Sequence, residues 1–560
     1  MPSVKLNKDV FEKLVGKKLP LEKLKDRISY LGTDLEKIEG NEIHVEVFPN
    51  RPDMLSEQGF ARAFSAFIGQ KPGLRNYSAK KAGHKLIVEK SLPKEWPFAF
   101  ACVIKGLTFT DERIREVIQL QEKLGVTLLR RRKKGGIGLY PLEKISFPIK
   151  FKGMDPDAIK FQPLEYPDVI TGREILSLHP TGREYAHIVE GWDRLPVFVD
   201  NKGIIMSMPP IINSHTVGKI DETTQNIFLE ITGNDFFTLQ TALSVMATSL
   251  ADMGGIIYSI DCVQQDGKAL EMPNLAPREM RLDLAYCNKL LGLNLKQQDA
   301  KKLLERMGYG FHNGNKENNG NCGKVLVPAY RYDILHQIDL VEDIAIAYGY
   351  ENFTAEIPSI STIGNEDAFY RFRERIATLL TGLGYMEAAT YHLGSHDINR
   401  KMQHEVEMIE LAGSKSQDYS FLRAWLLPNM LKVLSENTDN AYPQDIFEMG
   451  IVFRKNTAEE TNVEETWKLA VALSHGKANY THIKQVLETI ASHLELRPEL
   501  EELEHSSFIP GRGASISVKG KKVGFMGEVQ PVVLGNWNLE MPAVCLEINL
   551  NILYMLFLES

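Results

Sequence analysis

The sequence has no hydrophobic run long enough to cross a membrane, and it is poor in cysteine. None of its apolar stretches approaches the roughly 20 residues that a membrane-spanning helix requires. The first residues, Met-Pro-Ser-Val-Lys-Leu-Asn, contain no apolar core typical of a signal peptide. The five cysteines form no CxxC pair, so the sequence predicts neither a disulfide framework nor a zinc site. We therefore expect a protein of the reducing cytoplasm that does not enter a membrane.

An excess of positive charge is also missing. The formal net charge is −8, so the chain as a whole is not expected to attract nucleic acid electrostatically. The exception is a run of five cations at 130–134, which two glycines follow. These side chains could pair with phosphates in a salt-sensitive manner, or they could form a solvated, mobile loop. If the protein meets RNA, a partner is expected to supply much of the positive surface.

The length and the periodicity of the chain predict an α+β protein of several domains. With 560 residues, of which 43% are hydrophobic and 25% charged, we expect about three to five globular domains. Helical and strand patterns divide the chain into four modules. They are a small N-terminal α/β module (1–80), a mixed α+β module (81–272), a helix-turn-helix-like module (273–352) and a C-terminal α+β domain (358–560). The Asn- and Gly-rich tract 313–321 is predicted to be an exposed loop.

Four acidic residues are predicted to gather at the start of one helix. Residues 331–350 carry apolar residues at helical spacing. Asp339, Glu342 and Asp343 stand three and four positions apart, so their carboxylates share one face, and Asp333 can fold back toward them. A hard cation such as Mg²⁺, which prefers oxygen ligands, would relieve their mutual repulsion. The alternative is that these acids complement the helix dipole and face solvent.

A second group of polar residues lies on predicted strands. Glu230 and Thr232 are two positions apart in one strand, so both project from the same face. Taken alone, this alternation is typical of a strand at the solvent-facing edge of a sheet. Ser207 and Asn213 lie in a segment predicted to be a strand that ends in a turn. No serine or cysteine here has a histidine in a triad pattern, so a covalent mechanism is not predicted.

Two motifs of the chain resemble those of a known family. One is Asn50-Arg-Pro-Asp-x-x-Ser56, which we interpret as a structural turn whose Asp53 or Ser56 caps the following helix. The other is Leu340-Val-Glu-Asp-Ile-Ala-Ile-Ala-Tyr-Gly-Tyr350, together with the Pro-bearing linker after it. Over essentially its whole length the chain resembles the β-subunit family of phenylalanyl-tRNA synthetases, in its archaeal and eukaryotic cytosolic form.

The resemblance implies a ligase subunit with defined partners. In this family two α and two β chains form a heterotetramer that joins phenylalanine to tRNA(Phe) at the expense of ATP, and the synthetic active site lies on the α subunit. Carboxylates matching Asp333, Asp339, Glu342 and Asp343 bind a Mg²⁺ ion shared with the α subunit. The resemblance therefore makes Mg²⁺, the α subunit and tRNA(Phe) the expected cofactor and partners.

The resemblance also implies that module 81–272 is an editing module. Residues matching Ser207, Glu230 and Thr232 line a pocket that hydrolyses Tyr-tRNA(Phe), and Asn213 is a further candidate for holding the ester or the terminal ribose. An Asp in place of Glu230 is expected in relatives and would move the carboxylate by one methylene. Editing has a physical reason, because phenylalanine and tyrosine differ only by a hydroxyl. An apolar pocket discriminates against a substrate with one added hydroxyl by no more than on the order of 10²-fold. We expect water held by Glu230, Thr232 and the substrate's ribose to cleave the ester.

The C-terminal domain resembles the antiparallel-sheet domain of class II aminoacyl-tRNA synthetases without its active site. Formation of an aminoacyl-adenylate needs cations on the ATP phosphates, usually arginines and Mg²⁺. Arg423 has no acid beside it in the sequence, Arg512 does not open a Gly-rich helix, and the chain contains no P-loop. We therefore expect this domain to pair with the catalytic α subunit.

Two other functions fit the same sequence. The first is a non-catalytic scaffold that binds tRNA but has a decayed editing site, and it would leave tyrosine mischarging uncorrected. The second is a free-standing hydrolase of aminoacyl-tRNA, which would run as a stable monomer without an α partner.

Overall fold

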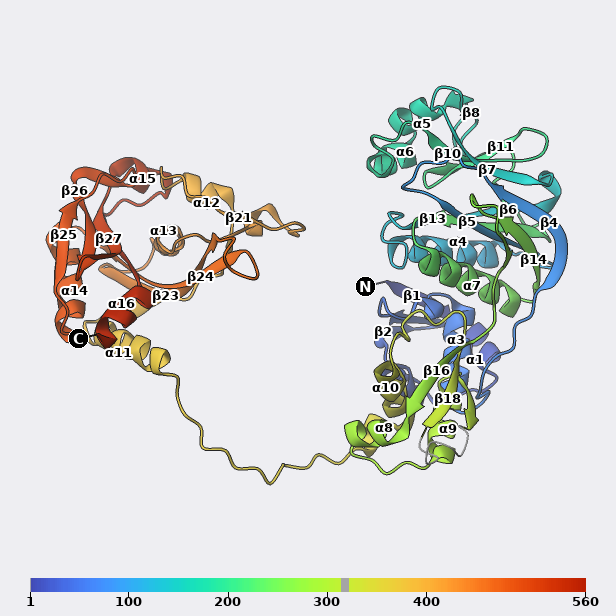
Figure 1. Cartoon of the computed structure of the whole chain (residues 1–560), viewed down its shortest axis with the longest axis horizontal. Helices are drawn as coiled ribbons and strands as arrows, with labels where there is room; N and C mark the ends of the chain where they lie inside the picture. The colour runs from blue at the N-terminus through green and yellow to red at the C-terminus, as the bar shows by residue number, and fades with distance from the viewer. Residues whose placement is uncertain (1, 314–321, 560) are drawn as a thin grey trace. The chain divides into compact units, whose positions relative to one another are not determined.

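Residues 353–367 form neither helix nor strand, and the chain divides there into two units, Met1–Ile357 and Pro358–Ser560 (Figure 1). The computed structural model describes residues 2–313 and 322–559, so most of the loop predicted at 313–321 lies outside the described residues. Both units mix helices and strands, which confirms the predicted α+β class, whereas the four module boundaries stay predictions. Among the described residues no helix combines the length and the apolar character needed to cross a membrane.

The first unit begins with a three-stranded antiparallel sheet of order β1-β3-β2. The motif at 50–56 follows it and is structural, as interpreted. Two guanidinium N–H groups of Arg51 donate to the Asp53 carboxylate at 2.9 Å, and the Ser56 hydroxyl accepts the Gly59 amide N–H at 3.0 Å. Ser56 rather than Asp53 therefore caps the next helix. The elements are β1 (Ser3–Asn7), α1 (Lys8–Val15), α2 (Leu21–Tyr30), β2 (Asp34–Glu39), β3 (Glu42–Glu46), η1 (Pro52–Met54) and α3 (Glu57–Phe67).

A ten-stranded sheet forms the centre of the first unit. Its main path is β12-β11-β10-β7-β4-β14-β5-β13-β6, and β15 pairs with β14. Helices α4 (Asp111–Val126) and α7 (Phe236–Asp252) lie side by side against this sheet (Figure 1). The strands are β4 (Lys80–Val88), β5 (Phe98–Lys105), β6 (Gly135–Pro141), β7 (Ile149–Met154), β10 (Leu195–Val199), β11 (Ile205–Met208), β12 (Ile212–Asn213), β13 (Ile227–Gly233), β14 (Ile256–Val263) and β15 (Ala269–Met272).

A small additional core packs on the β10–β11 end of this sheet. It contains the two-stranded pair β8 (Lys160–Phe161) and β9 (Ile170–Thr171) and the short helices α5 (Gly172–Leu178) and α6 (Pro180–Tyr185). Side chains from this insertion pack with those of β10 and β11 in one apolar cluster. The insertion thus has its own core and stands at one end of the sheet (Figure 1).

The first unit ends with a three-stranded sheet of order β16-β18-β17 and three helices. Helices were expected near 285–291 and 297–307, and the structure places α8 and α9 there. The third helix, α10, contacts both of them and buries Leu340, Val341 and Ile344. The elements are β16 (Arg278–Asp283), α8 (Leu284–Leu291), α9 (Gln297–Arg306), β17 (Gly310–Asn313), β18 (Cys322–Val327) and α10 (Gln337–Tyr348).

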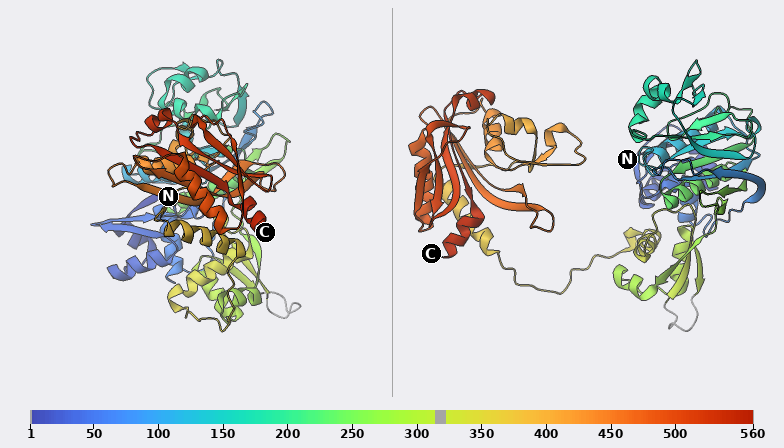
Figure 2. Two further views of the ribbon diagram at one scale, coloured as in Figure 1. Left: turned by 90° about the vertical axis from the view of Figure 1, so that its left-hand side faces the viewer. Right: turned by 45° about the horizontal axis from the view of Figure 1, so that its top comes forward.

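The second unit is a seven-stranded sheet of order β19-β23-β24-β28-β27-β26-β25 with an apolar core on each face. Leu469 and Val471 of β24 point into one core, and Ala470 and Ala472 into the other, because successive side chains of a strand face opposite ways. Helices α11, α14 and α16 cover one face and α13 the other (Figure 2). The main elements are α11 (Ala368–Gly382), β19 (Met386–Glu387), α13 (Leu427–Ser435), β23 (Gln444–Lys455), β24 (Val463–Ser474), α14 (Tyr480–His493), β25 (Pro498–Glu502), β26 (Phe508–Val518), β27 (Lys521–Val529), β28 (Ala543–Asn549) and α16 (Leu550–Leu558).

Candidate active site

Strand β13, which carries Glu230 and Thr232, lies inside the large sheet. It pairs along its whole length with β5 on one side and β6 on the other. The exposed fraction is 2% for Glu230 and 0% for Thr232. The alternative of a solvent-facing edge is therefore wrong, because an edge strand has only one neighbour and these side chains have no access to bulk water. Burying two polar side chains on one face of a central strand costs free energy unless hydrogen bonds compensate for it.

Glycines on β6 make the space that the Glu230 side chain occupies. Gly138 is the register partner of Glu230, and Gly136 that of Thr232. A Cβ on Gly138 would lie 2.2 Å from Glu230 Oε1 and 2.6 Å from the Tyr140 hydroxyl. Any side chain at this position would displace the carboxyl, so this strand requires glycine opposite Glu230.

A hydrogen-bonded group connects three of the strands. The hydroxyl oxygen of Tyr140 lies 3.2 Å from Glu230 Oε1 and 3.3 Å from Asn213 Oδ1. Asn213 is in turn the register partner of Ser207 across β11 and β12. The structure thus brings the predicted residues Ser207, Asn213 and Glu230 together. Tyr140 was missed from the sequence, although its position two residues after Gly138 puts it on the same face of β6.

Within the part of the chain that the structure describes, three side-chain atoms of this group are buried without a hydrogen-bond partner. They are the Ser207 hydroxyl, Glu230 Oε2 and the Thr232 hydroxyl. An unpaired buried polar atom costs about 1–3 kcal/mol, and nearly all buried polar atoms in native proteins are paired. Such a concentration in one place is typical of a site that awaits a polar ligand or water.

Burial raises the pKa of Glu230 to about 8, and the hydrogen bond from Tyr140 opposes this increase in part. The carboxyl group of the free protein is therefore mostly protonated at neutral pH. A protonated carboxyl donates one hydrogen bond and is a poor general base. This changes the expected role of Glu230 from activating water to forming a hydrogen bond with the substrate.

The raised pKa predicts a pH dependence of stability that a Glu230→Gln variant lacks. The folded chain holds a proton that the unfolded chain releases above its ordinary pKa of 4.5. This contribution is fully present below that pH and is lost as the pH rises through about 8. Relative to the variant, the free energy of unfolding should fall by about 1.4 kcal/mol per pH unit in this window. Urea unfolding of both proteins at several pH values measures it, and parallel curves would contradict the raised pKa.

A cavity of about 730 Å³ opens at Glu230 and Asn213. Ile114, Val117 and Ile118 of α4 give it an apolar wall, and the α5–α6 insertion contributes to the other side. The volume is in the range of pockets for small ligands, which are typically apolar with a few polar groups. Ser207 and Thr232 are buried behind this surface and do not line it.

The two histidines near the cavity form no nucleophilic site. His187 Nδ1 lies 3.0 Å from the carbonyl of Glu184, and His215 lines the cavity but is exposed. Neither is hydrogen-bonded to a serine or cysteine within residues 2–313 and 322–559.

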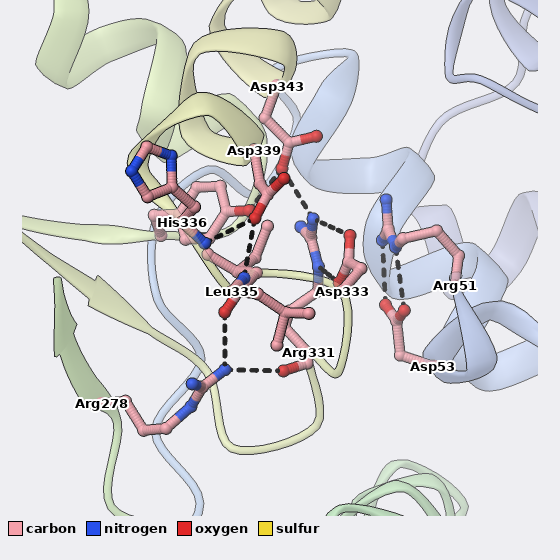
Figure 3. Close-up of polar contacts among 11 residues, drawn as sticks. Arg51, Asp53, Arg278, Arg331, Asp333, Leu335, His336, Asp339 and Asp343 are labelled. Carbon is pink, nitrogen blue, oxygen red and sulfur yellow. Dashed lines mark hydrogen bonds and ion pairs between the residues drawn. The ribbon is translucent and has the colours of Figure 1, made fainter. Parts of the chain in front are cut away.

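The four acidic residues around α10 are arranged differently from the expectation (Figure 3). Two N–H groups of Arg331 donate to both oxygens of Asp333 at 2.8 and 2.7 Å, and the same guanidinium donates to Asp343 Oδ2 at 2.7 Å. Burial alone would lower the pKa of Arg331, but the facing carboxylates raise it well above its ordinary value. The Tyr309 hydroxyl donates a further short hydrogen bond to Asp343. An arginine thus holds two of the four carboxylates.

The remaining two acids lie apart from that ion pair. Asp339 caps its own helix, and its Oδ2 accepts the amide N–H groups of Leu335 and His336 at 2.7 Å each (Figure 3). Glu342 is exposed. Among the described residues no group of three or more His, Cys, Asp or Glu side chains could hold a metal ion. The four residues carry the oxygen donors that Mg²⁺ prefers, but in this arrangement they do not fit one shared ion.

The two arginines considered for ATP binding in the second unit are each paired with a glutamate. Arg423 is buried and donates to Glu448 Oε1 at 2.6 Å. The absence of an acid beside Arg423 in the sequence is thus misleading, because the neighbouring strand β23 supplies one. Arg512 donates to Glu528 at 2.5 Å. With its charge compensated in this way, Arg423 is unavailable to phosphates.

Comparisons with known proteins agree on one family. The family model described as phenylalanyl tRNA synthetase beta chain CLM domain matches residues 354–550, and the tRNA synthetase B5 domain matches 280–350. The chain is 37% identical to the phenylalanine–tRNA ligase beta subunit of Pyrococcus horikoshii over 99% of this chain and 100% of that one. It is 38% identical to that of Archaeoglobus fulgidus over 98% of both. Among solved structures, an N-terminal fragment of the phenylalanyl-tRNA synthetase beta subunit from P. horikoshii superposes with a TM-score of 0.59 at 35% identity, covering 62% of this chain and 99% of the fragment.

Proposed function

Because the chain belongs to the β-subunit family of phenylalanine–tRNA ligases, we propose that it works with an α subunit on tRNA(Phe), and that its cavity removes tyrosine wrongly esterified to that tRNA. The ligase reaction joins phenylalanine to tRNA(Phe) with ATP. The observation that carries the editing proposal is the buried carboxyl of Glu230, which borders a cavity with polar and apolar walls and whose Oε2 has no hydrogen-bond partner among the described residues.

Glu230 would recognise the group that distinguishes tyrosine from phenylalanine. Its protonated carboxyl can donate a hydrogen bond to a phenol oxygen or accept one from a phenol O–H. The apolar wall of α4 suits the aromatic ring in either amino acid. A bound phenylalanine would leave the Glu230 carboxyl unpaired, and sites built around such a hydrogen bond reject the analogue that lacks it by 10⁴–10⁵-fold, roughly. The cavity therefore favours tyrosine.

Hydrolysis would proceed by direct attack of water. The water oxygen forms a bond with the ester carbonyl carbon, the bond between that carbon and the ribose oxygen breaks, and the ribose oxygen leaves with a proton. Water supplies the atoms of both new groups, so the products are free tyrosine and uncharged tRNA. Asn213 at the cavity surface is the residue we assign to holding the ester or the terminal ribose. Ser207 and Thr232 support this polar wall from behind.

The synthetic step would take place on the α subunit. Arg423 of the second unit is buried and paired with Glu448, so it is not free to stabilise charge on ATP, and Arg512 contacts Glu528. The second unit would instead bind the α subunit and have a structural role. This division leaves the present chain with editing and with contacts to tRNA.

Mg²⁺ stays a prediction for the assembled enzyme. We propose that Asp339 and Glu342, which Arg331 does not hold, provide this chain's share of the ligands and that the α subunit supplies the others. Mg²⁺ affinity of the α–β complex, measured by isothermal titration calorimetry, should then fall at least about tenfold in Glu342→Gln, the loss of one charged ligand being worth at least about 1.4 kcal/mol. It should not change in Asp333→Asn. Loss of affinity in Asp333→Asn would show that Arg331 releases this carboxylate in the complex.

The test of the editing function is deacylation of Tyr-tRNA(Phe) by the purified chain with and without the α subunit. Rapid hydrolysis in the presence of the chain supports the proposal. If the chain is inert while the α–β complex still charges phenylalanine, the chain is a scaffold. If it hydrolyses the ester as a stable monomer that does not associate with an α subunit, it is a free-standing hydrolase.

A further inference from the structure

The five-cation run predicted from the sequence is an ordered turn at the edge of the cavity. Arg130, Arg131 and Arg132 adopt φ values of +49°, +51° and +62°, a left-handed conformation that residues other than glycine rarely adopt in succession. The amide N–H of Arg131 donates to the carbonyl of Val126, and that of Arg132 donates to the carbonyl of Gly125, at 3.1 and 3.0 Å. The turn connects α4 to β6, and the two glycines after it begin that strand.

Arg132 attaches this turn to the cavity wall. Its Nη1 donates to the carbonyl oxygens of Pro210 and Ile211 at 3.0 and 2.9 Å. Its guanidinium also lies 4.2 Å from the ring centroid of Tyr185 in α6. All four residues line the cavity. Arg132 therefore joins the start of β6, the β11–β12 turn and the α5–α6 insertion, and its charge serves the wall rather than a ligand.

The other cations of the run divide into one that is paired and three that are free. Lys134 lies 3.7 Å from Asp235. Arg130, Arg131 and Lys133 are exposed, and none of them forms an ion pair with any residue of 2–313 or 322–559. They flank Arg132, which lines the cavity, so three unpaired positive charges stand beside its wall. In a chain of net charge −8, this cluster creates a local positive potential that attracts anionic groups.

We propose that Arg130, Arg131 and Lys133 bind the phosphates of the single-stranded 3′ end of tRNA and lead its terminal ribose to the cavity. This inference rests on the proposed editing function, which requires the tyrosine phenol at Glu230 and the aminoacyl ester at Asn213. A cavity of about 730 Å³ accommodates one nucleoside ester but no duplex, so the strand beside it must be single. Three cations on one turn can follow the phosphates of such a strand.

The experiment measures binding to the full-length chain of a minihelix that ends in the single-stranded 3′ nucleotides of tRNA(Phe), and of the same minihelix without them. The triple variant R130A/R131A/K133A should lose most of the wild-type preference for the tailed minihelix. The slope of log affinity against log salt should shrink by about 2, because each contact with a single strand contributes about 0.7. A control variant, K17A/K23A/K94A, removes three exposed lysines that do not line the cavity and should behave as wild type.

Kinetics of Tyr-tRNA(Phe) deacylation separate this inference from the function on which it rests. The triple variant should raise KM about tenfold and leave kcat within about twofold, and R130K/R131K should restore most of the loss. If the wild-type chain deacylates and the triple variant matches it in KM and in tail preference, the turn binds no phosphate. The inference about the turn is then wrong, while the proposed editing function stands. If the wild-type chain does not deacylate but the tail preference depends on the turn, the editing function fails and the RNA-binding surface stands.

Discussion

Glu230→Ala is expected to slow the hydrolysis of Tyr-tRNA(Phe) by on the order of 10²-fold, which corresponds to about 2.7 kcal/mol of transition-state stabilisation. The variant removes the carboxyl group that lines the cavity beside Tyr140 and Asn213. Because we assign Glu230 to the phenol, hydrolysis of Phe-tRNA(Phe), which is slow already, should change little. Single-turnover deacylation of both esters measures the two effects.

Two further variants make this prediction specific. Glu230→Gln keeps a side chain that can donate and accept hydrogen bonds, so it should retain more activity than Glu230→Ala. Thr232→Val keeps the shape of a residue that does not line the cavity and should have a smaller effect than Glu230→Ala. An equal loss with both esters would mean that Glu230 positions the water instead of the phenol. No loss with either ester would remove Glu230 from the site.

Arg331→Met is expected to lower the stability of the first unit by about 3–5 kcal/mol, since the variant leaves carboxylates buried without their cation. Arg331 has 2% exposure and donates to both Asp333 and Asp343. Calorimetry of the whole chain should show a lower transition temperature for the unit that contains residue 331. The transition of the second unit, residues 358–560, is the internal reference.

Arg278→Met is the matched control for this prediction. Arg278 lies near the same cluster but donates to the carbonyl oxygens of Arg331 and Ile334, at 3.2 Å, and to no carboxylate within residues 2–313 and 322–559 (Figure 3). Its loss should cost about 1–2 kcal/mol, the range of hydrogen bonds rather than of a buried ion pair. The triple variant R331M/D333N/D343N should recover part of the stability. If Arg331→Met and Arg278→Met were equally mild, the carboxylates would not depend on Arg331.

The sequence was informative about which residues matter and less so about how they are used. The spacing of Glu230 and Thr232 predicted one shared face, and the structure confirms that face. The sequence could not reveal that the strand is central, because this depends on β5 and β6, whose registers with β13 join residues about 90 to 130 positions apart. For the same reason, the sequence did not indicate that Tyr140 and Gly138 belong to the site.

The acids of α10 show the opposite case. Their helical spacing is local and was predicted correctly, but two of them pair with Arg331, which a turn places against Asp333 and Asp343. The same holds for Arg423, whose partner Glu448 is 25 positions away in the sequence. Two of the acids around α10 are paired by an arginine from the turn just before the helix, and Arg423 is paired by a glutamate on another strand.

The sequence by itself determined the α+β class, the family and the location of both groups of polar residues, because these depend on composition, local periodicity and short motifs. Only the tertiary structure decided that Glu230 is buried and mostly protonated, that Arg331 holds two of the predicted metal ligands, and that the arginine run splits into a wall residue and exposed cations. Protonation and ion pairing depend on which groups lie within a few ångströms and how much water remains between them. Those distances arise only when strands far apart in the chain are brought side by side.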